Sequence, residues 1–234
     1  MLRSPVMLAR AAAILLGLVV ATDLFALWAG SFMLDVSDEV YLGSGVGRID
    51  RADRVYRAAG IAQTVALVAT VVVYLCWFHR VRVNAEVFRP DGHSKSRGWA
   101  IGGWFTPIVN LWYPRRITLD IWDASSPGAP WDRPRSHTLV NVWWTAWILS
   151  LLADRAGSRM YDRAETATEL GNAVRQLMFA DGIDLAAAVL AILVVLRLTA
   201  MQNAKVLEGP PGDPAGPTGP AGPNSPTNPI GLSG

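Results

Sequence analysis

Cysteine and histidine are scarce in this sequence, which has one cysteine, Cys76, and three histidines in 234 residues. A single cysteine cannot form an internal disulfide, and the histidines do not have the spacing of metal ligands. The sequence also has no phosphate-binding loop, dinucleotide-binding turn or nucleophile motif. We therefore expect no metal, no cofactor and no enzymatic activity, and we interpret Cys76 as a small buried hydrophobic residue.

Charge is scarce as well, since charged residues make up 17% of the chain and about 25% of a typical soluble domain. The formal net charge of +2 is too small to suggest a nucleic-acid partner. Hydrophobic residues make up 51% of the chain and lie in blocks close to the roughly 20 residues that a helix needs to cross a bilayer. We predict an all-α integral membrane four-helix bundle, with helices at about residues 8–32, 59–79, 137–153 and 177–200.

The first apolar block follows Arg3 and Arg10, as it would in a signal peptide. The block is longer than the usual hydrophobic region of a signal peptide, and no convincing small-x-small cleavage site follows it. We interpret it as a retained membrane helix.

A fifth apolar stretch, WAIGGWFTPIVNLWYP at residues 99–114, raises the alternative of five crossings. The segment from His79 to His137 contains nine of the chain's 21 basic residues, and cytoplasmic loops near helix ends are enriched in Lys and Arg. Four crossings keep this segment and both termini in the cytoplasm, whereas five would place Arg115 and Arg116 outside. The charge pattern therefore favours four.

The stretch also has features that weaken a membrane-spanning helix. Gly102 and Gly103 lower helix stability, and Pro107 removes a backbone donor. Such backbone is tolerated at membrane depth only where protein or water satisfies it. We predict a re-entrant or interfacial segment at residues 98–125, which ends in a short amphipathic helix in the membrane plane.

Eight of the ten tryptophans fall between Trp99 and Trp147. They form either an aromatic belt that anchors the protein or a docking surface for lipid or a protein partner. The neighbouring arginines either bind anionic headgroups or only fix the topology. The candidates for lipid or partner binding are Trp99, Trp104, Pro107, Asn110, Trp112, Arg115 and Arg116.

Asp23 is the most unusual single residue, because a carboxylate inside a membrane helix is costly and often functional. From the helix rise, Gln63 and Thr64 reach a similar depth, and Asp184 lies near the outer end of the last helix. These four residues are the intramembrane polar candidates. They form either a proton or cation site or a set in which a protonated or hydrogen-bonded Asp23 fixes helix packing.

Small residues recur at four-residue spacing on two predicted helices, at Ala13, Gly17 and Ala21 on the first and at Gly182 and Ala186, then Ala187 and Ala191, on the last. Such faces let helices approach closely, either within one chain, which we favour, or in a homo-oligomer. Residues 207–234 are rich in glycine and proline, and we predict a disordered tail after a membrane domain at residues 1–206.

The stretch RVRVNAEVFRPDGHSKSRGWAIGGWFTPIVNLWYPRRITLDIWDASSP, residues 80–127, closely resembles the signature of a family of actinobacterial membrane proteins. This is the domain of unknown function 4328 family, and the resemblance extends more loosely over residues 11–204. It implies a multi-helix bacterial membrane protein and no particular activity or catalytic residue.

The sequence thus predicts a protein of the bacterial cytoplasmic membrane with both termini in the cytoplasm. The function we favour at this point is a scaffold or regulatory component that acts through its basic, Trp-rich segment on membrane lipids or a protein partner. The alternative is a small-solute, proton or cation transporter or channel that uses Asp23.

Overall fold

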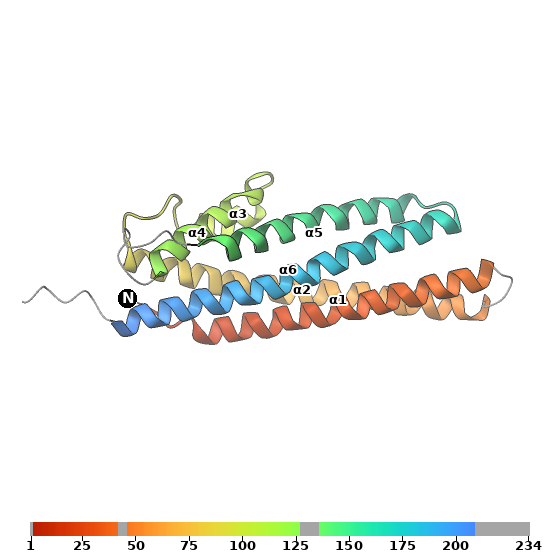
Figure 1. Ribbon diagram of the computed structural model, residues 1–234, viewed down its shortest axis with the longest axis horizontal. Helices are drawn as coiled ribbons and strands as arrows, with labels where there is room; N and C mark the ends of the chain where they lie inside the picture. Colours follow the sequence, from red (N-terminus) through yellow and green to blue (C-terminus); the bar gives the residue numbers. More distant parts are fainter. Residues whose placement is uncertain (1, 42–45, 127–135, 209–234) are drawn as a thin grey trace, which may run out of the picture.

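The computed structural model describes residues 2–41, 46–126 and 136–208. The helices of these residues are α1 (Val6–Tyr41), α2 (Val46–Phe88), α3 (Trp99–Phe105), the 3-10 turn η1 (Val109–Leu111), α4 (Tyr113–Ser125), α5 (Thr138–Arg163) and α6 (Ala167–Glu208). Within these ranges there is no strand, so the predicted all-α class is confirmed. Four long helices lie side by side, and α3 and α4 lie near the end that carries the N-terminus (Figure 1).

Three of the long helices are long and apolar enough to cross a membrane, over Val6–Ser37, Gly47–Phe88 and Ala167–Leu207. Together they indicate a membrane protein. α5 is not among them, because polar residues such as Asn141 and Asp154 interrupt its apolar sequence.

The long helices continue well beyond the apolar blocks that predicted them. α2 begins at Val46 instead of residue 59, and α6 begins at Ala167 instead of residue 177. The polar extensions stay helical because they still bury apolar side chains against one another. Val36 and Ala52 are fully buried there, with Leu170 packed against them.

The long helices pack as a row in the order α2, α1, α6, α5, and each helix runs antiparallel to its neighbour (Figure 1). α2 and α5 stand at the two ends of this row and share no comparable interface. Near the chain termini, α3 and α4 fill the space between them, since α3 and α4 both pack on α2 and α4 also packs on α5 and α6. On this side α3 and α4 close the bundle near one end, and the stacked rings of Tyr56 and Tyr161 join α2 to α5 toward the other.

α4 is the short amphipathic helix expected after residue 116, but its apolar side chains do not face lipid. Ile117 and Ile121 are fully buried and Trp122 nearly so, all within the main hydrophobic core. Buried polar groups hold this helix in place: Gln202 on α6 donates to Ser125 Oγ (3.2 Å) and to the Val81 carbonyl (2.8 Å). The apolar face of α4 is therefore used for packing within the protein.

Two further expectations about small residues need correction. Cys76 is exposed on the outer surface of α2 instead of buried. Gly17 and Ala21 are exposed too, so the α1 stripe does not serve packing within the chain. On α6, Ala187 and Ala191 are buried, but Gly182 and Ala186 are exposed. In the predicted tail, residues 207 and 208 still belong to α6, and residues 209–234 lie outside the described part of the chain.

Candidate functional site

A cavity of about 460 Å³ lies between the four long helices, near the middle of α1. Four aspartates line it: Asp23 from α1, Asp154 from α5, and Asp181 and Asp184 from α6. α2 contributes the amide of Gln63. None of the described residues that line the cavity is a lysine, arginine or histidine, so its wall is acidic.

Gln63 links two of these carboxylates across three helices. Its Nε2 donates to Asp181 Oδ1 at 2.8 Å and to Asp23 Oδ1 at 3.1 Å. A primary amide has two N–H groups, so one can serve each carboxylate. Gln63 thereby holds α1 and α6 in register at the level of the cavity.

Asp23 has a second oxygen with no such partner. Its side chain is buried, with 2% relative exposure, and Oδ2 has no hydrogen-bond partner among the residues described. Leaving a buried acceptor unsatisfied costs about 1–3 kcal/mol, and more for a charged group. Because Asp23 lines the cavity, a ligand bound there would lie beside a carboxylate with one unsatisfied oxygen.

The charge of the cavity wall is not balanced by the described residues that form it. Two carboxylates that share one amide repel each other, and the repulsion is stronger in a low-dielectric interior than in water. A proton or a bound cation between Asp23 and Asp181 would reduce this repulsion. The electrostatics of the site therefore favour a positively charged ligand.

The cavity has room because small residues face it. Ala26, Ala59, Gly60 and Ala180 lie on its wall, and a Cβ added at Gly60 would meet no atom within 4 Å. Its volume falls within the range of about 300–1,000 Å³ that is typical of small-molecule sites. The space suits a ligand of several non-hydrogen atoms.

Aromatic side chains stand at two edges of the cavity. Trp147 of α5 lines it and contacts Trp104 of α3, with ring centroids 5.5 Å apart. Tyr56 of α2 also lines it and stacks on Tyr161 of α5 at 6.2 Å. Aromatic faces attract cations, so these rings and the acidic wall both favour a cationic ligand.

The four polar residues singled out in the sequence all lie on this one cavity: Asp23, Gln63, Thr64 and Asp184. Their side chains do not contribute equally. Thr64 is exposed and its hydroxyl donates to the Gly60 carbonyl of its own helix at 2.8 Å. Asp154 is exposed as well, so the polar interior is formed mainly by Asp23, Asp181, Asp184 and Gln63.

Sequence reasoning missed Asp154, Tyr56 and Trp147. Asp154 comes directly after an apolar block and Tyr56 lies in a polar stretch, so both were placed outside the membrane helices. Trp147 was counted with the aromatic belt. A helical continuation of α2 and α5 past their apolar blocks would have revealed the first two.

The Trp-rich segment is joined to the cavity through Trp104. This ring lies between Tyr74 of α2, 5.6 Å away, and Trp147 of α5, 5.5 Å away. Of the eight tryptophans from Trp99 to Trp147, Trp122, Trp143 and Trp144 are buried in the same core. The interpretation of these tryptophans as a surface belt is wrong for the buried ones, whereas Trp99 and Trp112 are exposed.

The turn between α3 and α4 has a strained backbone. Ile108 has φ 66° and ψ −50°, and the Val109 N–H donates to the Pro107 carbonyl at 2.7 Å, which closes a γ-turn. A β-branched residue rarely adopts positive φ. Pro107 and Ile108 are exposed at this turn, and Asn110 is half-buried.

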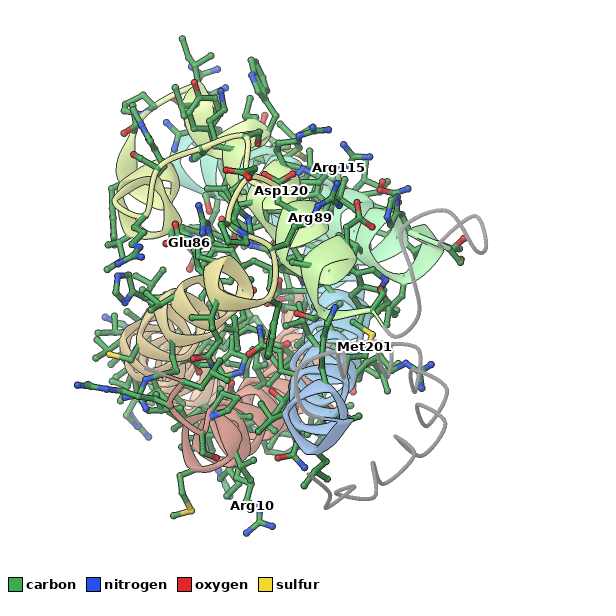
Figure 2. The ribbon with its side chains drawn as sticks, turned by 90° about the vertical axis from the view of Figure 1, so that its left-hand side faces the viewer. Arg10, Glu86, Arg89, Arg115, Asp120 and Met201 are labelled. Atoms are coloured by element: carbon green, nitrogen blue, oxygen red, sulfur yellow. The ribbon has the colours of Figure 1, made fainter. Side chains whose placement is uncertain are left out.

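The two arginines that follow have protein partners. Arg115 is half-buried and donates to Asn141 Oδ1 from Nε (3.1 Å) and Nη2 (2.7 Å). Arg116 is exposed and lies 3.5 Å from Asp120. Figure 2 shows Arg115, Asp120 and Glu86 on the same side of this end of the bundle. Neither arginine reaches the cavity.

Residues 44–200 match a family model described as "Domain of unknown function (DUF4328)". No curated protein and no solved structure matches the chain. The match covers more than half of the sequence and includes every helix that lines the cavity except α1.

Proposed function

Because the chain belongs to the domain of unknown function DUF4328 family, we propose a role from the site alone: a multi-pass membrane protein that binds and translocates small cations. The observation that carries this proposal is the acidic cavity, with a buried carboxylate oxygen of Asp23 that lacks a partner among the described residues. Transporter sites commonly lie near the bilayer midplane between helices, and this cavity lies near the middle of α1.

The proposed topology has four crossings, formed by α1, α2, α5 and α6. Supporting it, α5 has 26 residues, about 39 Å at the helix rise, and packs closely along α6. The described termini and the basic Trp-rich segment share one end of the bundle (Figure 1), which the positive-inside tendency assigns to the cytoplasm of a bacterial cell.

An organic cation fits the site better than a metal ion. Among the described residues, no group of three or more His, Cys, Asp or Glu side chains is close enough to hold a metal. The aspartates instead surround a space of molecular size with aromatic rings at its edges. This arrangement is typical of the recognition of ammonium groups by carboxylates and aromatic faces.

Binding of quaternary ammonium ions to the full-length protein in nanodiscs tests the proposal. Equilibrium dialysis with radiolabelled tetramethylammonium and octyltrimethylammonium is expected to give saturable binding of at least one probe. Asp23→Asn is expected to weaken it at least tenfold, because a neutral amide cannot offset the ligand's charge. Flux of the bound probe into proteoliposomes, lost in the same variant, is the expected sign of translocation.

The matched control is Asp35→Asn, which removes an exposed carboxylate from the same helix just over three turns away. It is expected to bind like the wild type. If neither probe binds in a manner that depends on Asp23, the proposed cation site is refuted.

The second proposal is a scaffold or regulatory role through the Trp-rich segment, which would enter the cytoplasmic membrane face as a re-entrant turn. It is supported by the large apolar side chains exposed at the α3–α4 turn, where Phe105 is 65%, Ile108 69% and Trp112 54% exposed. Such side chains favour lipid or an apolar partner surface over water.

A spin label at Ile108→Cys, in a Cys76→Ala background, tests this insertion. We expect its collision rate with oxygen to exceed that with a water-soluble nickel complex, as it does for labels in the hydrocarbon region. The reverse order would show that the turn lies in water. A label at the exposed Ser96→Cys is the aqueous control.

We propose a non-enzymatic protein whose partners are membrane lipids and, at the cytoplasmic face, another protein. The exposed Gly17 and Ala21 on α1 are compatible with a homo-oligomer.

A further inference from the structure

We infer that the ligand of the acidic cavity is an amphiphilic amine, with a cationic head and an apolar chain, that enters sideways from the lipid between α2 and α5. This inference rests on the cation site proposed above and adds the chemistry of the ligand and its route.

The route follows from the packing order of the helices. α1 packs on α2 and on α6, and α6 packs on α5, but α2 and α5 share no comparable interface. Among the described residues, aromatic side chains bridge the gap between α2 and α5 at two levels. Tyr56 stacks on Tyr161 at one level, and Trp104 joins Tyr74 to Trp147 at the other.

The cavity lies between these two levels, since Tyr56 and Trp147 both belong to its wall. Its α2 and α5 edges carry apolar side chains that the protein does not bury. Leu67 on α2 is 54% exposed and Leu151 on α5 is 41% exposed. In a membrane these two leucines would meet lipid chains, so the cavity has an apolar opening on its lipid-facing side.

The inner part of the cavity has the opposite character. Asp23 is buried, with Oδ2 unpartnered among the described residues, and Asp181 shares the Gln63 amide with it. A ligand that satisfies both parts needs a positive group at the depth of Asp23 and an apolar chain along Leu67 and Leu151. A polar cation without a chain would leave the apolar opening without a partner.

The nanodisc assay with a chain-length series tests this. At concentrations corrected for partition into empty nanodiscs, octyltrimethylammonium is expected to bind at least tenfold more tightly than tetramethylammonium, and Asp23→Asn to abolish this difference. Leu67→Trp, which narrows the opening, is expected to weaken octyltrimethylammonium binding several-fold more than tetramethylammonium binding.

The matched control is Val68→Trp, which adds the same bulk at an exposed neighbour that does not line the cavity. It is expected to bind both probes like the wild type, and its yield shows whether α2 accepts a new tryptophan. A diazirine at the end of the octyl chain is expected to label α2 near residue 67 or α5 near residue 151, as located by mass spectrometry.

The outcomes separate the two proposals. Asp23-dependent binding that is equally tight for both probes, or insensitive to Leu67→Trp, overturns the amphiphile and keeps the cation site. Labelling confined to other helices also overturns the lateral route. Absence of any Asp23-dependent binding overturns both.

Discussion

Ile108, in the turn between α3 and α4, has a strained backbone with positive φ. Its positive φ costs on the order of 1–3 kcal/mol for a non-glycine residue. We expect Ile108→Gly to raise the midpoint of thermal unfolding in detergent, where the exposed isoleucine side chain contributes little packing. Ile108→Ala keeps the Cβ and hence the strain, so a similar gain in that control would contradict this explanation.

His93, in the connection between α2 and α3, gives the segment a pH dependence. Burial, and then the nearby Arg82 guanidinium, lower the pKa of His93 below its ordinary value of 6.5, and the carboxylates of Asp120 and Glu86 oppose this without reversing it. Because the folded pKa is depressed, the unfolded chain takes up the proton first as pH falls. The stability contribution is therefore present above about pH 6.5 and declines as the pH falls through the folded pKa.

We expect the thermal midpoint of the wild type to drop more between pH 7.5 and 5.5 than that of His93→Gln. The measurement is a pair of melting curves at each pH in the same detergent. Equal drops in the two proteins would assign the pH dependence to other groups.

At the scale of the elements, the register of α5 on α6 depends on a close approach at Gly157. A Cβ at this position would lie 2.8 Å from Leu177 Cδ2 and 3.2 Å from the Leu177 backbone nitrogen. The side chain can rotate away, but the backbone of α6 cannot, so Gly157→Ala is expected to destabilise the protein by about 1–3 kcal/mol. Unfolding in a mixed-detergent titration measures this.

Gly17→Ala is the control for this prediction. It adds the same methyl group to a helix where nothing lies within 4 Å of the new Cβ, so its unfolding midpoint should stay at or above that of the wild type. Because Leu177 also lines the cavity, a shift of α5 in Gly157→Ala is further expected to weaken cation binding.

The sequence allowed the elements to be predicted better than their contacts. Asp23 and Gln63 could be placed at one depth because the helix rise is constant, and the structure joins them by a hydrogen bond. Asp154 could not be added, because its position depends on how far α5 continues as a helix. Trp104 could not be placed beside Trp147 either, since that contact depends on the chain folding back between α3 and α4.

At the scale of the whole molecule, the proposed four-crossing topology predicts which end of the bundle faces the cytoplasm. In a Cys76→Ala background, Ser96→Cys lies near the end with the termini and Ser158→Cys lies at the opposite end, and both positions are exposed. We expect a membrane-impermeant maleimide added to intact cells to label Ser158→Cys and to spare Ser96→Cys until the cells are permeabilised.

The reverse labelling pattern would invert the topology. Labelling of both positions in intact cells would be incompatible with residues 96 and 158 lying on opposite sides of the membrane. Either result would move the basic segment away from the cytoplasmic lipid surface and remove the basis of the scaffold proposal.

The four helices that surround the cavity are continuous at its level. Their main-chain carbonyls are therefore committed to the helices themselves and are not free to replace the water shell of an ion. A small inorganic ion such as sodium would have to give up its hydration for a few carboxylate oxygens, at a large energetic cost. A bulky ammonium ion is only weakly hydrated and gives up little, so the unbroken helices themselves would select against sodium and potassium in favour of organic cations.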